Sequence, residues 1–279
     1  MASRAAGIAT VAVLGYLSVC TYMWSTQIQH VFLPSPIIQT TPDRLGMKYE
    51  ELRIPVGSGA DKGDLNAWWV HANKLGAPAV LYLHGNENNI GAHLEGAKRF
   101  HTLGLNVLLV DYRGYGKSTG GDPSEVKVYE DAETAWQYLL KQRGVKAQQI
   151  FIYGNSLGGA IGIDLAVHHA DAAGLIAEST FTSMADMGRL VYGYLPVDLL
   201  LNQRFESLEK IPRLRIPVLL IHGKEDKKIP YQMSQQLFAA APQPKQLVLI
   251  EGGEHGNSGR IGWPVYRETV SEFIGKYAR

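Results

Sequence analysis

Residues 154–159 read Gly-Asn-Ser-Leu-Gly-Gly and follow the apolar run Ile-Phe-Ile-Tyr at 150–153. A helix-length segment comes next, so the serine lies in a G-x-S-x-G pattern at a strand-to-helix turn. The glycines permit a turn sharp enough to hold Ser156 above the edge of a sheet, and the start of the helix directs its positive end at a developing oxyanion. This pattern predicts that Ser156 is a catalytic nucleophile. The alternative is a glycine-rich turn with an idle serine.

A serine hydroxyl is a weak nucleophile at neutral pH and needs a general base. Proteins with this turn carry the acid and then the histidine later in the chain. Asp226 comes shortly after the apolar run at 218–221, and His255 comes shortly after the run at 246–250. Both side chains should lie at the carboxyl ends of parallel strands, where open α/β sheets bind ligands. We therefore predict Ser156, Asp226 and His255 as the catalytic residues.

Other titratable residues compete for these roles. Glu178, at the end of the run at 174–177, and Glu225, beside Asp226, are rival acids. His84 and His222 each precede a glycine at a strand end, and we interpret both as structural residues that tie loops by hydrogen bonds. No His, Asp and Glu cluster has the spacing of metal ligands, so we predict neither a metal nor another cofactor.

An oxyanion hole requires two preorganised N–H groups. One should belong to Leu157, the residue after the nucleophile, and the other to the loop after the third strand. That loop, residues 84–89, reads His-Gly-Asn-Glu-Asn-Asn, and we assign the second donor to the backbone of Asn86. The alternative is that this loop only connects two elements.

Short apolar runs alternate with helix-length segments along most of the chain. The first two runs alternate in polarity and predict an antiparallel pair, whereas the others are typical of strands buried on both faces. The predicted strands are residues 49–56, 65–72, 79–83, 106–110, 150–153, 174–177, 218–221 and 246–250. The predicted helices are residues 90–103, 126–142, 157–170, 231–241 and 265–277. The chain is therefore predicted to be an α/β protein with a mainly parallel eight-stranded sheet, and residues 181–212 break the alternation as a small helical cap.

The overall composition is that of a folded protein with no large charge excess. The chain has 279 residues, with 27 Lys and Arg against 26 Asp and Glu, and 46% hydrophobic residues. This near-neutral balance excludes the broad basic field that nucleic-acid binding requires. The single cysteine excludes an intrachain disulfide. The number of subunits is left open.

The N-terminal region differs from the rest. Residues 5–24 carry no charge, and a helix of that length spans about 30 Å, the thickness of a bilayer core. Tyr22 and Trp24 suit an interfacial aromatic belt, and Arg4 places the only nearby positive side chain on the N-terminal side. We therefore predict a single-pass membrane anchor with the N-terminus in the cytoplasm and an extracytoplasmic catalytic domain.

Three other interpretations of this N-terminal segment are possible: a cleaved signal peptide, a lipoprotein signal ending at Cys20, and an ordinary core helix. Residues 27–42 contain three prolines and are interpreted as a linker or an extended arm. The predicted organisation is an anchor and linker at residues 1–42 followed by a catalytic domain at residues 43–279.

With these features the sequence resembles the α/β-hydrolase superfamily of serine hydrolases. More narrowly, it is similar to membrane-anchored members related to monoacylglycerol lipases and protein depalmitoylases. The stretches that carry the resemblance are LYLHGN at 81–86, DYRGYGKS at 111–118, GNSLGG at 154–159, ESTFTS at 178–183, IPVLLIHGKEDKKIP at 216–230 and GGEHGN at 252–257. One departure is HGNENN in place of the lipase-type HGGG loop, which leaves the second oxyanion donor less defined.

The resemblance implies a Ser156–His255–Asp226 triad that hydrolyses esters or thioesters of acyl or lipid-like substrates through an acyl-enzyme. It also implies a cap and a membrane contact through the N-terminal helix. Two alternatives stay open. One is a serine peptidase of the same superfamily, and the other is a non-catalytic binding module on the same fold.

Overall fold

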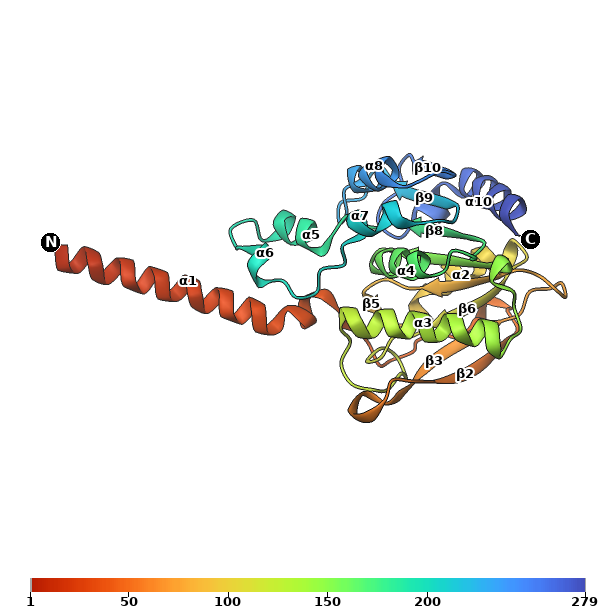
Figure 1. Cartoon of the computed structure of the whole chain (residues 1–279), viewed down its shortest axis with the longest axis horizontal. Coiled ribbons are helices and arrows are strands. Elements are labelled where there is room, and N and C mark those ends of the chain that lie inside the picture. Colours follow the sequence, from red (N-terminus) through yellow and green to blue (C-terminus); the bar gives the residue numbers. More distant parts are fainter. Residues whose placement is uncertain (1, 279) are drawn as a thin grey trace.

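The computed structural model describes residues 2–278 and shows an eight-stranded sheet between layers of helices (Figure 1). The predicted apolar runs form its strands, and the central runs are buried on both faces, whereas the first and the last run are partly exposed. The strands of this sheet are β2 (Tyr49–Val56), β3 (Gly63–Val70), β4 (Ala79–Leu83), β6 (Asn106–Val110), β7 (Ile150–Asn155), β8 (Gly174–Glu178), β9 (Val218–Gly223) and β10 (Lys245–Ile250). All eight predicted strands are confirmed.

The order of strands across the sheet is β10-β9-β8-β7-β4-β6-β3-β2. β3 runs antiparallel to both of its neighbours, β2 and β6, and the other neighbouring strands are parallel. The predicted antiparallel first pair is therefore confirmed. Because β7, β8, β9 and β10 are parallel, the loops that follow them lie at one edge of the sheet.

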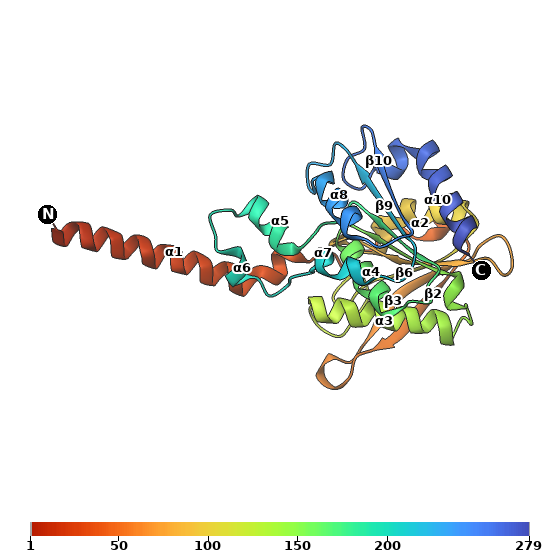
Figure 2. The ribbon, with the colours of Figure 1, turned by 45° about the horizontal axis from the view of Figure 1, so that its top comes forward.

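Helices cover both faces of the sheet (Figure 2). On one face α2 (Leu94–Thr102) and α10 (Trp263–Tyr277) pack on side chains such as Val80 of β4. On the other face α3 (Glu125–Lys141), α4 (Leu157–His168) and α8 (Tyr231–Ala240) pack on the alternate residues, such as Leu81. This alternation is expected because successive side chains of a strand point to opposite faces. The predicted fold class is confirmed.

The shorter elements lie in the connections. They are β1 (Leu33–Pro34), η1 (Pro42–Leu45), η2 (Gly59–Asp61), β5 (Glu87–Asn88), η3 (Ile90–His93), η4 (Ala147–Gln149), α5 (Met184–Val191), α6 (Val197–Leu200), α7 (Ser207–Lys210), η5 (Ile211–Arg213) and α9 (Ser258–Ile261). The cap predicted at residues 181–212 contains α5, α6 and α7. Ser183 begins α5, because its hydroxyl accepts a hydrogen bond from the N–H of Asp186.

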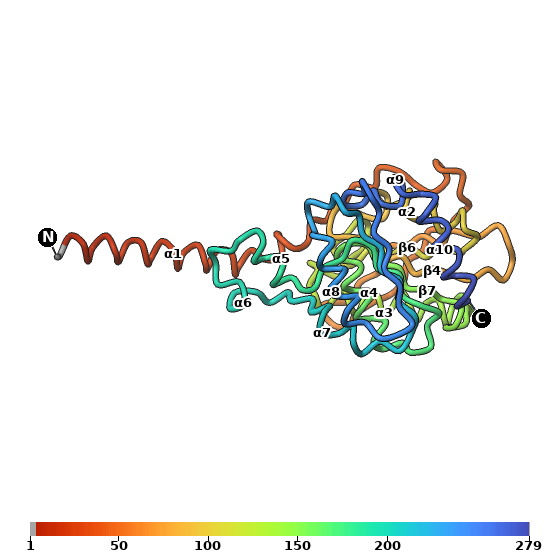
Figure 3. Tube along the Cα trace, turned by 90° about the horizontal axis from the view of Figure 1, so that it is seen from above, coloured from red at the N-terminus to blue at the C-terminus, as the bar shows by residue number. Residues whose placement is uncertain are grey.

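Helix α1 (Ala2–Val31) projects away from the α/β body, and α5 and α6 of the cap lie beside it in each view (Figures 1, 2 and 3). The predicted start of the linker at residue 27 is therefore too early, since the helix continues to Val31. The chain then pairs β1 with β5, in parallel, directly after the third strand of the main sheet. The sequence missed this contact because a two-residue strand has no recognisable pattern.

One helix of the described chain, residues 4–31, is long and apolar enough to cross a membrane, with a mean hydropathy of 1.6 in its most apolar window. Only 6% of that window is buried inside the protein, which is unlike the core helix of a soluble domain. Length and composition do not distinguish a membrane anchor from a signal sequence, because a signal sequence near the N-terminus has the same properties.

Candidate active site

The turn between β7 and α4 holds Ser156 in a conformation that few residues adopt. Its φ is +55° and its ψ is −119°, a region in which an L side chain is strained. The turn can close this tightly because Gly154 has no side chain. A Cβ on Gly154 would lie 2.0 Å from the carbonyl oxygen of Gly158. The G-x-S-x-G spacing thus meets a steric requirement of the turn.

Two further glycines bring the turn against the neighbouring strands. A Cβ on Gly158 would lie 2.1 Å from the carbonyl oxygen of Leu83, at the end of β4. Gly85, in the loop after β4, lies so close that its own Cβ would be 3.5 Å from the Cβ of Ser156. The loop that was predicted to supply an oxyanion donor is therefore adjacent to Ser156.

Two hydrogen bonds to the backbone of Ser156 hold the residue in place and leave its hydroxyl free. The N–H of Ser156 donates to the carbonyl of Glu178 at 2.9 Å, and the hydroxyl of Thr180 donates to the carbonyl of Ser156 at 2.9 Å. The Ser156 hydroxyl itself has no hydrogen-bond partner within residues 2–278, His255 included. Such a contact is often absent or long in a structure without substrate.

Asp226 and His255 are brought together across the loops after β9 and β10. His255 Nδ1 lies 2.8 Å from Asp226 Oδ2. A carboxylate can only accept here, so Nδ1 carries the proton and Nε2 is left as the basic nitrogen. The other oxygen, Asp226 Oδ1, accepts from the N–H groups of Lys228 and Ile229, each at 2.9 Å. The carboxylate is therefore oriented from both sides.

The charge of Asp226 is stabilised by its surroundings. Burial raises the pKa of this carboxyl, but hydrogen bonds from His222, from His255 and from the N–H of Ile229 outweigh burial and hold the pKa below its ordinary value. Asp226 thus stays ionised at neutral pH. An ionised carboxylate at this place stabilises an imidazolium on His255.

The two histidines interpreted as structural are buried. His222 Nδ1 accepts from the hydroxyl of Ser234 at 2.6 Å, while Nε2 lies 2.9 Å from the carbonyl of Ile229 and 3.2 Å from Asp226 Oδ2. His222 therefore also positions Asp226, a contact that its place next to a glycine did not reveal. Burial, together with the charge of nearby His93, lowers the pKa of His84 to about 3, so His84 is neutral.

The structure separates the rival acids from His255. Glu178 is fully buried on the α2 and α10 side, where its carboxylate accepts from Tyr153 and Tyr266 at 2.7 and 3.1 Å. The Glu225 side chain is exposed and has no hydrogen bond to His255. Of the three acids, only Asp226 contacts the histidine. Within residues 2–278 no group of three or more His, Cys, Asp and Glu side chains is arranged to hold a metal ion.

The N–H groups assigned to the oxyanion hole have no acceptor within the described chain. Neither the amide of Leu157 nor that of Asn86 donates a hydrogen bond to another part of residues 2–278. The carbonyl groups of the loop after β4 are, in contrast, occupied. Tyr112 donates to His84 O at 3.0 Å, and Tyr115 donates to Asn86 O at 2.8 Å. This bracing fixes the loop while the Asn86 N–H stays available.

Tyr115→Phe tests this bracing. We expect kcat to fall about fivefold, because the lost hydrogen bond is worth about 1 kcal/mol, while KM changes little, since the predicted oxyanion donor would act in the transition state. Asn86 O keeps its second donor, the N–H of Leu33 at 2.9 Å, so the fold should survive. Tyr138→Phe, on the outer helix α3, is the matched control. Equal kcat values for the two variants would contradict a positioning role for Tyr115.

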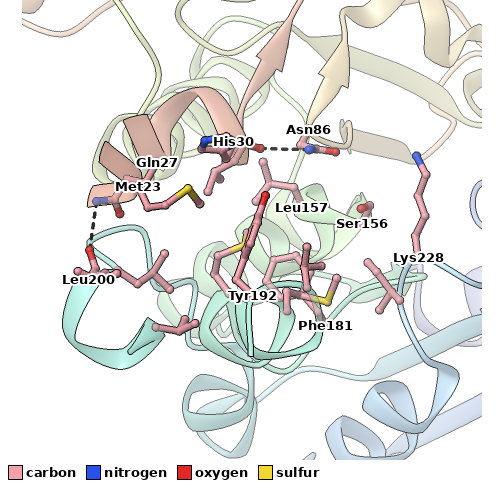
Figure 4. Close-up of a pocket in the computed structure, with 18 of the residues that line it drawn as sticks. Met23, Gln27, His30, Asn86, Ser156, Leu157, Phe181, Tyr192, Leu200 and Lys228 are labelled. Atoms are coloured by element: carbon pink, nitrogen blue, oxygen red, sulfur yellow. Dashed lines mark hydrogen bonds between the residues drawn. The ribbon is translucent and has the colours of Figure 1, made fainter. Parts of the chain in front are cut away.

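Ser156, His255, Leu157 and Asn86 all line one cavity of about 340 Å³ (Figure 4). Most of its wall is apolar and comes from the cap and from the end of α1. The apolar lining residues are Met23, Val31, Leu157, Phe181, Met184, Met187, Val191, Tyr192, Leu195, Val197, Leu200, Leu201 and Ile229. The polar remainder includes an ion pair between Lys228 and Glu87 at 2.9 Å. The arrangement can hold an apolar group beside the Ser156 hydroxyl.

A protein-family model described as serine aminopeptidase, S33, matches this chain over residues 77–203 and 200–257. An uncharacterised protein of Mycobacterium tuberculosis (strain ATCC 25618 / H37Rv) is 33% identical over 276 residues, which cover 99% of this chain and 96% of the relative. The α/β-hydrolase domain-containing protein WAV2 of Arabidopsis thaliana is 30% identical over 257 residues, covering 85% of this chain and 82% of WAV2.

Among solved structures, the esterase Pf2001 of Pyrococcus furiosus superposes with a TM-score of 0.73 at 20% identity. The match covers 89% of this chain and 98% of the esterase. At this identity the likeness concerns the fold. The similarity to the mycobacterial relative reaches into α1, whereas the family model begins only at residue 77.

Proposed function

The chain belongs to the α/β-hydrolase superfamily, in the family described as serine aminopeptidase, S33. From this premise we propose that the protein is a serine hydrolase. We propose that it cleaves carboxylic ester or thioester bonds of acyl substrates. The observation that carries the proposal is the shared pocket, in which Ser156 and the Asp226-bound His255 lie beside an apolar wall. Ser156, His255 and Asp226 are the proposed triad.

In the proposed reaction, His255 Nε2 takes the proton of Ser156 as the hydroxyl oxygen attacks the acyl carbonyl. The Leu157 and Asn86 amides stabilise the oxyanion. Collapse of the tetrahedral intermediate breaks the bond to the alcohol or thiol, which leaves with the proton from His255. An acyl-enzyme remains on Ser156. Water, deprotonated by His255, then releases the acid and restores the serine.

The lining of the pocket supports an acyl ester over a peptide. An aminopeptidase must bind the charged amino group of its substrate, for which a free carboxylate is the usual partner. Among the described residues that line the pocket, the only carboxylate is Glu87, and it is paired with Lys228. An apolar wall instead favours a hydrocarbon chain. The description of the matching family keeps a serine peptidase as the second candidate.

We further propose that α1 is retained as a membrane anchor. A signal peptide cleaved at the end of α1 would remove residues that the folded domain uses, because the side chain of Cys20 is buried against the cap and Gln27 lines the pocket. A lipoprotein signal would be cleaved before Cys20, which would remove the hydrogen bond from Tyr16 to the carbonyl of Tyr194 and would require a lipid on the buried Cys20 thiol. Leu190, Tyr194 and Leu199 of the cap are exposed beside this helix, Leu199 to 85%. Exposed apolar side chains next to an apolar helix are typical of contact with a membrane surface.

The activity can be tested on the full-length protein in detergent. We expect labelling by a fluorophosphonate and hydrolysis of p-nitrophenyl butyrate and octanoate, with dipeptide p-nitroanilides cleaved far more slowly. Faster turnover of the anilides would favour the peptidase. Absence of labelling and of turnover on every substrate would contradict a serine hydrolase and favour a binding module.

A further inference from the structure

The wall of the pocket includes a helix that lies outside the matching family region. Met23, Gln27, His30 and Val31 of α1 are lining residues, whereas the family match begins at residue 77. We propose that residues 23–31 of α1 form part of the substrate site and that Met23 limits the length of the acyl chain it accepts. This inference rests on the proposed esterase function.

The C-terminal end of this segment is attached to the oxyanion loop. The side-chain amide of Asn86 donates to the carbonyl of Val31 at 3.1 Å, as Figure 4 shows. The N–H of Leu33 in turn donates to the carbonyl of Asn86 at 2.9 Å. The helix end is therefore held beside Asn86, whose backbone amide is a proposed oxyanion donor.

Gln27 joins the helix to the cap. Its side chain is 8% exposed. The amide nitrogen donates to the carbonyl of Leu200 at 3.3 Å and to that of Trp24 at 2.8 Å, and the amide oxygen accepts from the N–H of Asn202 at 2.6 Å. One buried side chain thus satisfies backbone groups of both segments. Such a contact holds the cap at a fixed distance from α1.

The contact between α1 and the cap continues beyond Gln27. Cys20 is buried in an apolar cluster with Ala185, Leu195 and Val197, and Met23 packs against this cluster. The hydroxyl of Tyr16 donates to the carbonyl of Tyr194 at 3.0 Å. The contact is too extensive for a passive tether, and it closes the side of the pocket that faces the helix.

The pocket runs along α1 away from the nucleophile. Met23 lies eight residues before Val31, so it is about 12 Å farther along the helix axis. In Figure 4, Met23 and Ser156 lie at opposite sides of the pocket, with Leu157 and Tyr192 between them. An acyl chain bound to Ser156 would extend over these side chains toward Met23. Methionine is flexible and suited to closing an apolar cavity of irregular shape.

The test measures kcat/KM of the full-length protein for p-nitrophenyl acetate, butyrate, octanoate, dodecanoate and palmitate. Each methylene that the pocket buries is expected to raise kcat/KM about fourfold. Met23→Trp should shift the optimum to shorter chains and lower the ratio of kcat/KM for dodecanoate to that for butyrate at least tenfold. Met23→Ala should move the same ratio in the opposite direction. This ratio is independent of the fraction of active enzyme, so partial misfolding does not imitate the result.

Ser25→Trp, at an exposed position of the same helix, is the matched control and should keep the wild-type profile. If both Met23 variants reproduce the wild-type profile, or if Ser25→Trp shifts it equally, α1 does not set the chain length, although the esterase function stands. If the wild-type protein hydrolyses none of the esters and escapes fluorophosphonate labelling, the proposed function fails and this inference fails with it.

Discussion

Ser156→Ala should abolish fluorophosphonate labelling and lower kcat for p-nitrophenyl esters by a factor of about 10⁶, the loss measured when a triad serine is removed from a comparable hydrolase. The physical reason is that the variant has no atom at the turn that can form the acyl-enzyme. The Leu157 and Asn86 amides and the apolar wall are unchanged. KM for the residual reaction should therefore differ little.

The substitution should leave stability almost unchanged, because the Ser156 hydroxyl has no hydrogen-bond partner within residues 2–278. Thermal unfolding measures this. Ser124→Ala is a control of the same chemical type, since it removes a hydroxyl that begins α3 by accepting from the N–H of Lys127. That variant should lose about 1 kcal/mol of stability and keep its labelling. Persistent labelling of Ser156→Ala would overturn the assignment of the nucleophile.

Asp226→Asn should lower kcat about 10⁴-fold with little change in KM, which is the effect of the same substitution in a serine protease triad. The asparagine oxygen can still accept from the Lys228 and Ile229 N–H groups. Its NH2 group, however, would face the N–H groups of His222 and His255. Relief of this donor–donor conflict requires His255 to accept at Nδ1, and Nε2 then carries the proton and cannot act as a base.

Glu225→Gln is the matched control, because this exposed acid is adjacent in sequence and should be silent. Glu178→Gln tests the other rival acid. This substitution should lower the stability of the folded protein and leave kcat almost unchanged. If Glu225→Gln or Glu178→Gln lowered kcat as much as Asp226→Asn, the acid would be wrongly assigned.

The stability of Asp226→Asn should depend on pH. The pKa of Asp226 is lowered in the folded protein, so its ionised form contributes stability above the ordinary aspartate pKa, and this contribution is lost as pH falls through the lowered pKa. The variant should therefore unfold at lower temperature than wild type at neutral pH, and the difference should shrink in acid. A difference that is constant with pH would contradict an ionised Asp226 in the folded state.

The fold class and the tight turn at Ser156 were predictable because they depend on local patterns. A strand buried on both faces must be continuously apolar, and the six runs of this kind, together with the two alternating runs, became the strands of one sheet. The spacing of Gly154, Ser156 and Gly158 is imposed by close backbone approaches, so it is visible in six consecutive residues. The order of acid and histidine follows from the order of the parallel strands.

Contacts between distant segments were not predictable in the same way. Tyr112 and Tyr115 lie in the DYRGYGKS stretch that carries the family resemblance, but nothing in their spacing showed that they brace the carbonyl groups of the loop after β4. Likewise, His222 was interpreted as a loop tie, and its contact with Asp226 emerged from the turn that follows β9. Such partners depend on side-chain direction in the packed protein, which sequence spacing does not specify.

Helix α1 shows most clearly the difference between what local sequence predicts and what long-range packing decides. Its length and apolar composition are properties of one continuous segment, so residues 5–24 were sufficient to predict a span of bilayer thickness. Its role as a wall of the pocket depends on Gln27 meeting Leu200, 173 positions away. The helix and strand periodicities of a sequence do not indicate a contact between residues at that separation. The proposed catalytic residues could therefore be named from local sequence, whereas the shape of the space beside them depends on the packing of the cap against α1.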